Sequence, residues 1–186
     1  MNILPFKIGF MGVHSSSKTT TVNRMARVLK DMDIPVAVVT EVARDCPFPL
    51  NKYGSFKSQL WMLQEQIKRE LSAVDTVSRL ERERQMKTVH PRFNGVVLCD
   101  RTIWDYYAYG MALLEDKAMT AEEFRVLKNA VSSWANVLSY DRLYFCEPKP
   151  LYDDGFRDTN EEWRNAVYSC FKRMIKENAL KVTIIQ

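Results

Sequence analysis

The strongest constraint on the fold is the octapeptide GVHSSSKT at residues 12–19, which follows the apolar run FKIGFM. It matches the phosphate-binding pattern G-x-x-x-x-G-K-[ST], except that Ser17 replaces the second glycine. Such a loop must lie between the end of a strand and the start of a helix, where backbone amides face an anion. A serine-rich helix N-terminus without a ligand is the alternative, because serine caps helices well. The joint spacing of Gly12, Lys18 and Thr19 favours a phosphate-binding loop.

Each position of the loop has an expected role. Gly12 permits the turn out of the strand, Lys18 reaches the β- and γ-phosphates, and the hydroxyl of Thr19 ligates Mg²⁺. The loop amides donate to phosphate whatever the side chains are, so Ser17 adds only modest crowding. The residues expected to bind the nucleotide are Gly12, His14, Ser15, Ser16, Ser17, Lys18, Thr19 and Thr20.

Strand and helix signals alternate along the chain. Short apolar runs predict strands at 6–11, 35–40, 95–100, 141–147 and 181–186. Helical periodicity predicts helices at 18–32, 55–88, 102–115, 120–138 and 160–178. This alternation predicts one α/β domain over residues 1–186, a three-layer sandwich with a mainly parallel five-stranded sheet between helices. In the long helix at 55–88, the expected buried stripe is Leu60, Leu63, Ile67, Leu71, Val74 and Leu80.

The composition is that of an ordinary globular protein, with 46% hydrophobic residues and a net charge of +4. No apolar run approaches the ~20 residues of a membrane span, and the four scattered cysteines do not form a metal-binding or disulfide pattern. We therefore expect a cytoplasmic protein without a membrane partner. The mildly basic charge leaves a DNA partner open, and a homodimer also stays open.

Charged residues follow the second and third predicted strands. Glu41 comes after the second strand, and Asp100 and Arg101 come after the third. Because the carboxyl ends of parallel strands share one edge of the sheet, these side chains and Lys18 should converge on one crevice. Two carboxylates and two cations suit phosphoryl transfer. In the simpler alternatives, Glu41 pairs with Arg44 or begins a helix, and Asp100 and Arg101 form an ion pair at the next helix.

With these segments the chain resembles the P-loop nucleoside and nucleotide kinases, within an AAA-type ATPase and kinase group that includes the ribosylnicotinamide kinase domain. The resemblance covers nearly the whole chain and rests on GVHSSSKT, Glu41, DRTIWDYY at 100–107, and DDGFRDTNEEWR at 153–164. It implies ATP and Mg²⁺ as cofactors. By this resemblance Glu41 is the catalytic base, the Asp100–Arg101 pair follows the third strand, and a lid at about 150–165 brings Arg157 and Arg164 to the phosphates.

Asp100 and Glu41 can each take one of two roles, as metal ligand or as the group that acts on the acceptor hydroxyl. In the first arrangement Thr19 and Asp100 hold Mg²⁺ and Glu41 orients or deprotonates the acceptor hydroxyl, while Arg101 fixes the substrate. The alternative exchanges Asp100 and Glu41. Residues 45–90 carry no motif that names the acceptor. Aromatic residues at helical spacing more often fill a core than stack on a base, so we expect core positions for Trp104, Tyr106, Tyr107 and Tyr109.

We therefore expect a kinase that moves the γ-phosphate of ATP to a hydroxyl of a nucleoside- or nucleotide-like acceptor. One alternative is a kinase acting on hydroxymethylated pyrimidine bases in DNA. The other is an ATP-dependent binding module or switch, which would hydrolyse ATP without an acceptor.

Overall fold

The computed structural model describes residues 4–85, 95–150 and 160–186. Its sheet contains β1 (Phe6–Met11), β2 (Val36–Val39), β3 (Val96–Asp100), β4 (Arg142–Cys146) and β5 (Val182–Ile185). All neighbouring strands are parallel, in the order β2-β3-β1-β4-β5. The predicted parallel sheet is confirmed, with each strand within one or two residues of its expected bounds.

The helices also lie where the periodicity predicts them. They are α1 (Lys18–Asp31), α2 (Phe56–Gln85), α3 (Ile103–Glu115), α4 (Ala121–Val137) and α5 (Glu161–Glu177), with short 3₁₀ helices at η1 (Val42–Asp45) and η2 (Asn51–Tyr53). Side-chain caps explain several starts: Thr102 with Asp105 before α3, and Thr120 with Glu123 before α4, form capping boxes. In the described part of the chain, no helix is long and apolar enough to cross a membrane.

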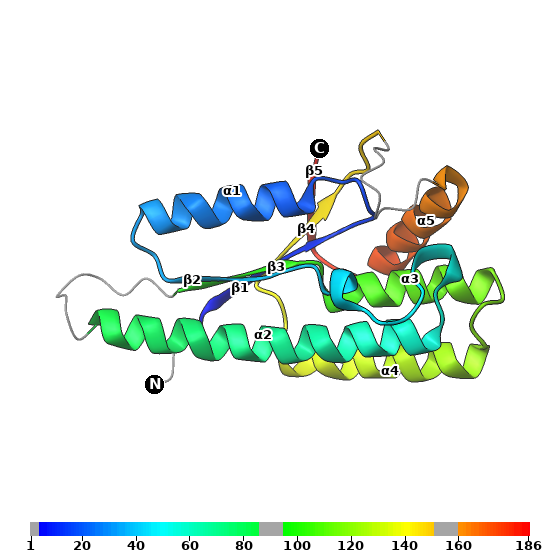
Figure 1. The fold of residues 1–186 in the computed structure, drawn as a ribbon, viewed down its shortest axis with the longest axis horizontal. Helices are drawn as coiled ribbons and strands as arrows, with labels where there is room; N and C mark the ends of the chain where they lie inside the picture. Colours follow the sequence, from blue (N-terminus) through cyan, green and yellow to red (C-terminus); the bar gives the residue numbers. More distant parts are fainter. Residues whose placement is uncertain (1–3, 86–94, 151–159) are drawn as a thin grey trace.

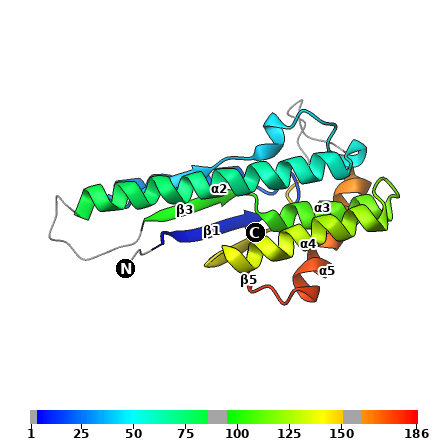
Figure 2. The ribbon, with the colours of Figure 1, turned by 90° about the horizontal axis from the view of Figure 1, so that it is seen from below.

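The helices cover the two faces of the sheet unequally. Figure 1 shows α1 on one side of the strands, with α2, α3 and α4 on the other. Seen from below, α2, α3 and α4 pack side by side (Figure 2). The side chains of α5 join the same core as α3, so four helices share one face and α1 covers the other. This arrangement is the expected three-layer sandwich.

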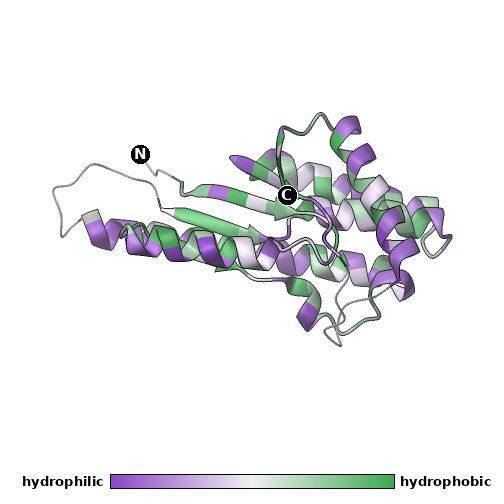
Figure 3. Ribbon diagram, turned by 90° about the horizontal axis from the view of Figure 1, so that it is seen from above, coloured by the Kyte–Doolittle hydropathy of each residue, from purple (hydrophilic) through white to green (hydrophobic). Residues whose placement is uncertain are grey.

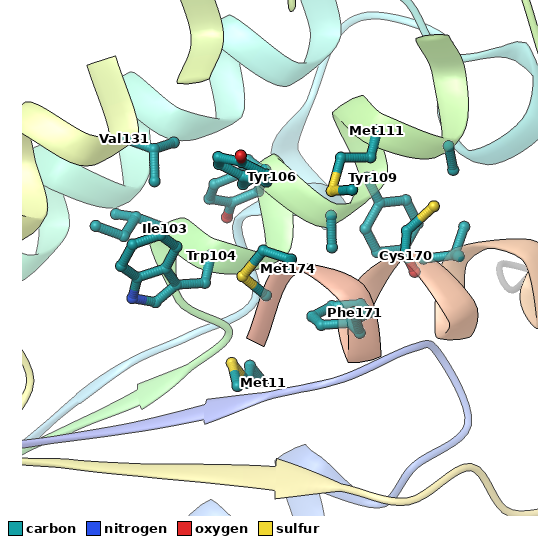
Figure 4. Close-up of a cluster of buried hydrophobic side chains, with 14 of the residues drawn as sticks. Met11, Ile103, Trp104, Tyr106, Tyr109, Met111, Val131, Cys170, Phe171 and Met174 are labelled. Atoms are coloured by element: carbon teal, nitrogen blue, oxygen red, sulfur yellow. The ribbon is translucent and has the colours of Figure 1, made fainter. Parts of the chain in front are cut away.

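The core is built from opposite faces of the same strands. Ile8 and Phe10 of β1 pack toward α1, whereas Met11 joins the larger cluster under α3 and α5. Hydrophobic residues predominate along the strands, whereas hydrophobic and hydrophilic residues alternate along the helices (Figure 3). The close-up in Figure 4 shows the aromatic rings of α3 beside Phe171 and Met174. The core position expected for Trp104, Tyr106, Tyr107 and Tyr109 is confirmed, since all four are buried.

The buried face of α2 differs from the predicted stripe. Leu63 and Val74 are buried, but Leu71 and Leu80 are exposed, so that part of the prediction is wrong. Polar side chains take buried positions on this helix instead: Ser58, Gln59, Gln66 and Glu70. A hydrophobic pattern cannot predict them, because their burial depends on hydrogen-bond partners from other elements.

The strand order brings the candidate residues together. β3 lies between β1 and β2, so the carboxyl ends of these three strands adjoin. The loop at 12–17 leaves β1, Glu41 follows β2, and Asp100 ends β3. The carboxyl ends of strands in open parallel sheets form the usual ligand-binding crevice.

Candidate active site

The glycine that begins the loop is required by close packing. Gly12 has φ +141°, and a Cβ atom there would lie 2.6 Å from the carbonyl oxygen of Cys146. No L-residue with a side chain fits this position without moving the backbone of β4. The predicted role of Gly12 as the turn out of β1 therefore has a steric basis in the fold.

Ser17 explains why glycine is usual at its position. It is the N-cap residue of α1, with φ 58° and ψ 20°, in the left-handed region that favours glycine. Ser15 also has a positive φ, 56°. Left-handed residues in such a loop are typical of anion-binding concavities. Serine therefore adopts the backbone conformation of the missing glycine.

A cavity of about 200 Å³ lies over this loop. All seven residues from His14 to Thr20 line it, together with Lys149 and Pro150 from the segment after β4. The backbone N–H of Lys149 donates to the carbonyl oxygen of Ser15 at 2.8 Å, which joins the two segments. Of the loop residues expected to bind the nucleotide, all except Gly12 thus line one polar cavity.

Lys18 is buried inside the loop. Its Nζ donates to the carbonyl oxygens of Gly12 at 2.9 Å and Val13 at 2.7 Å, and to Ser16 Oγ at 3.0 Å. Burial and the nearby Arg101 guanidinium lower the pKa of Lys18 to about 8, against the opposing effect of nearby carboxylates. A polyanion in the cavity would favour the charged ammonium.

The hydroxyl of Thr19 donates a hydrogen bond to Asp100 Oδ2 at 2.6 Å. The first turn of α1 and the end of β3 thus bring two oxygen ligands together. Hard oxygen donors of this kind suit Mg²⁺, which in nucleotide sites needs few protein ligands besides phosphate oxygens and water. The pair therefore fits the predicted magnesium ligands, Thr19 and Asp100.

A second charged group lies beside the loop. Arg101 donates to Glu41 Oε1 through Nε at 2.8 Å, and its Nη2 lies 2.7 Å from the same oxygen. Glu41 also lies 3.5 Å from Arg44 Nε, so the simpler alternative for Glu41 accounts for only part of its contacts. Burial raises the pKa of Glu41, but Arg101 and Lys18 outweigh this effect and hold the pKa at about 2.

Asp105 joins the two groups and was missed by sequence reasoning. Its Oδ1 accepts hydrogen bonds from Arg101 Nη1 at 3.2 Å and from the backbone N–H of Gly12 at 3.3 Å. Its Oδ2 accepts from the backbone N–H and the hydroxyl of Thr102, both at 2.9 Å. The T-x-x-D spacing at 102–105 signals this cap, although not the contacts with the loop.

A small cavity adjoins Arg101, and no residue of the phosphate loop lines it. Its volume is about 30 Å³, and it is lined by Ala43, Leu50, Asn51, Gln59, Met62, Arg101, Asp105, Tyr106 and Tyr109. The Arg101 guanidinium lies 5.6 Å from the centre of the Tyr109 ring. Gln59 Oε1 is buried and, within the described residues, has no hydrogen-bond partner. A buried amide oxygen without a partner points to a missing donor.

The two lid arginines have different outcomes. Arg157 lies outside the described residues, and its role stays a prediction. Arg164 is buried at the start of α5, where its Nη1 donates to the carbonyl oxygen of Lys149 at 2.7 Å and Nη2 lies 3.5 Å from Glu161. Arg164 thus anchors the segment that lines the loop cavity, and its predicted contact with phosphate is untested.

Comparison with known protein families identifies the family of this chain. A family model described as AAA domain matches residues 7–186. The chain belongs to the AAA domain family. A search of curated proteins found no match.

Solved structures share the fold. The NadR protein in complex with NR has a TM-score of 0.70 and 22% identity, and the match covers 98% of this chain and 46% of that one. The NadR protein in complex with NAD and AMP-PNP also has a TM-score of 0.70, with 18% identity, and the match covers 98% of this chain and 44% of that one. The chain therefore spans just under half of these proteins. Deoxyadenosine kinase from M. mycoides with bound dCTP has a TM-score of 0.62 and 14% identity, and the match covers 97% of this chain and 88% of that one. The fold is that of the P-loop kinases.

Proposed function

We propose that this chain transfers the γ-phosphate of ATP, with Mg²⁺, to a hydroxyl of a nucleoside- or nucleotide-like acceptor. The observation that carries the proposal is Asp105, which bonds both the backbone of the phosphate loop and the guanidinium of Arg101. The Asp105 carboxylate thereby holds the phosphate loop next to the pair formed by Arg101 and Glu41. Phosphoryl transfer needs this juxtaposition, because its catalysis is mostly positioning and charge stabilisation.

The loop would hold the phosphates of ATP. Lys18 would exchange its contacts with loop carbonyl oxygens for phosphate oxygens, and the loop amides would donate to the remaining ones. Thr19 and Asp100 would hold Mg²⁺, which supplies charge neutralisation on the phosphates when bound. These roles assign the metal to Asp100 and leave Glu41 to the acceptor.

We assign the acceptor to the small cavity beside Arg101. Gln59 presents an amide, which can pair with the donor and acceptor edge of a nucleobase, and Tyr106 and Tyr109 supply flat apolar walls. Its volume of about 30 Å³ holds little more than one water, so an acceptor must move the η1–η2 segment outward. The acceptor hydroxyl would then lie at the Arg101–Glu41 pair.

The ionised Glu41 would accept a hydrogen bond from that hydroxyl and aim its oxygen at the γ-phosphorus. The new phosphorus–oxygen bond forms as the bond to ADP breaks. The hydroxyl proton passes to Glu41 late, when the attacking oxygen has become acidic. A carboxylate with a pKa of about 2 is a weak base, so orientation is its main contribution. Arg101 would bind the acceptor or the transferred charge.

The test is a transfer assay with ATP labelled at the γ-phosphate and a panel of nucleosides, nucleotides, ribosylnicotinamide and DNA containing hydroxymethylated pyrimidines. We expect label on a nucleoside- or nucleotide-like acceptor. The Gln59→Leu variant should raise its KM by about tenfold, the effect of one lost hydrogen bond to a buried partner. Gln64→Leu, at an exposed position of the same helix, is the matched control. Label on DNA alone would favour the DNA alternative, and no label on any acceptor would contradict the proposal.

A further inference from the structure

Arg101 has a strained backbone. Its φ is 86°, whereas the other positive-φ residues besides glycine in the described ranges lie between 48° and 59°. A positive φ costs a residue with a side chain on the order of 1–2 kcal/mol, so the surroundings must enforce it. A strained residue at a proposed active site raises the question of what holds it.

Contacts at both ends of its backbone hold Arg101. Its N–H donates to the carbonyl oxygen of Phe10 at 3.0 Å, which continues the pairing of β3 with β1. Its own carbonyl oxygen accepts from Gln66 Nε2 at 3.1 Å. Gln66 comes from α2 and is fully buried. Two side chains therefore hold the peptide after Arg101: Gln66 at its carbonyl oxygen and Asp105 at the N–H of Thr102.

The orientation of the Gln66 amide is determined by its neighbours. Nε2 also donates to Glu70 Oε1 at 2.9 Å, and Oε1 accepts from the Tyr106 hydroxyl at 3.1 Å. Reversing the amide would place its oxygen against the Glu70 carboxylate and the Arg101 carbonyl, which are both acceptors. The nitrogen must therefore face Arg101.

Glu70 is itself held by a buried ion pair. Its Oε2 lies 2.9 Å from Lys7 Nζ, and both side chains are almost fully buried. The hydroxyl of Tyr140 donates to Glu70 Oε1 at 2.5 Å. A fully bonded network of this kind is rigid, because any movement leaves a buried polar group without a partner. Lys7 holds Glu70 independently of Tyr140, so the carboxylate stays beside Gln66 when the Tyr140 hydroxyl is removed.

We propose that Gln66 is a positioning residue for phosphoryl transfer, which acts by holding Arg101 in its strained conformation so that the guanidinium faces Glu41. This inference rests on the proposed function. Without the Gln66 amide, the Arg101 carbonyl would be buried and unbonded, and the residue would relax toward negative φ. The direction of its side chain would change with it.

The test compares wild type with Gln66→Met, which keeps the length of the side chain but removes the amide. We expect kcat to fall by about 10–10²-fold, since a misplacement of about 1 Å can cost that much, while the Kd for ATP changes less than about twofold. In an Arg101→Ala background, Gln66→Met should cost no further turnover, because the amide acts on turnover only through the guanidinium, which that background already lacks. If Gln66→Met does not fold, Gln66→Asn replaces it in the test. Its shorter side chain cannot bring the amide to the Arg101 carbonyl, so we expect the same loss of kcat.

Tyr140→Phe is the control for stability. It removes hydrogen bonds to Glu70 and to the backbone N–H of Ile103 but leaves the contact between Gln66 and Arg101. We expect a lowered Tm with kcat within about twofold of wild type. If Tyr140→Phe loses as much turnover as Gln66→Met, or if the costs of Gln66→Met and Arg101→Ala simply add, Gln66 has only a structural role.

A second measurement does not depend on activity. The Nε–H of Arg101 should give a protected NMR signal, because it is buried against Glu41. We expect Gln66→Met to abolish this protection and Tyr140→Phe to retain it. Retained protection in Gln66→Met would overturn the inference even if no acceptor were phosphorylated, whereas a loss of protection without any transfer would count against the proposed function alone.

Discussion

Arg101 and Glu41, which follow neighbouring strands, form a partly buried ion pair in which Nε and Nη2 both lie within 2.8 Å of one carboxylate oxygen. Asp105 ties the same guanidinium to the phosphate loop at Gly12. The pair therefore lies beside the phosphate loop. In the proposed mechanism the acceptor hydroxyl would enter between these two residues, and their charges would orient it.

The first prediction concerns Glu41. Glu41→Gln keeps the shape of the side chain but removes the charge that orients the hydroxyl. We expect turnover to fall by about 10²-fold or more, with little change in the Kd for ATP. Steady-state kinetics and equilibrium binding measure the two effects. Glu65→Gln, which removes a carboxylate from a surface pair, is the matched control, and an equal loss there would refute the assignment.

The second prediction concerns the metal ligands. Asp100→Asn leaves a hydrogen-bond acceptor for Thr19 but weakens the charge at the proposed Mg²⁺ site. We expect the affinity for ATP in the presence of Mg²⁺ to fall by about tenfold or more, while the affinity without metal hardly changes. Titration of ATP with and without Mg²⁺ checks this difference. If Asp100→Asn instead slows turnover with normal affinity, and Glu41→Gln shows the metal effect, the two roles are exchanged.

The third prediction concerns the charge of Lys18. Its pKa is about 8 in the free protein, so the amine loses its proton above that pH, and bound phosphates would raise the pKa again. ATP binding at about pH 9 should therefore take up protons, and affinity should fall as the pH rises through about 8. Calorimetry in buffers of different ionisation enthalpy measures the uptake.

At about pH 7 Lys18 is already charged, so the same experiment should show little uptake from this group. Equal uptake at both pH values, or uptake that persists in Lys18→Ala, would assign the proton to another group.

The fourth prediction concerns Ser17. Glycine at this position relieves a left-handed strain of about 1–2 kcal/mol but adds about 0.4–1 kcal/mol of freedom to the unfolded chain. We expect Ser17→Gly to stabilise the protein by about 0–1.6 kcal/mol, and ATP to bind as tightly as before or more tightly. Thermal unfolding and binding measure these changes. Ser17→Ala keeps the strain, so a comparable gain in stability there would contradict the explanation.

Much of the fold could be predicted because it depends on local pattern. The strand at 95–100 is a continuous apolar run between polar segments, and the helix at 18–32 follows the loop directly. Parallel pairing then places Lys18, Glu41, Asp100 and Arg101 at one edge of the sheet, as the structure confirms. The chemistry of these side chains follows from their types and spacing.

The rest depended on contacts between distant segments. The sequence did not single out Gln66 and Glu70, because nothing local shows that Arg101 and Lys7 approach them. The positive φ of Arg101 and Ser17 is equally hidden, since neither residue favours it. The predicted stripe of α2 was wrong at Leu71 and Leu80 for a related reason: polar side chains of this helix are buried instead, and their burial is decided by their partners.

The most direct test of the kinase assignment compares ADP formed with label transferred, using ATP labelled at the γ-phosphate and a mixture of nucleosides and nucleotides. We predict about one label on an acceptor for each ADP, little ADP without acceptor, and neither product with Lys18→Ala, whose ammonium is needed for the phosphates. Release of inorganic phosphate at the same rate with and without acceptor would contradict the kinase assignment and favour an ATP-dependent switch.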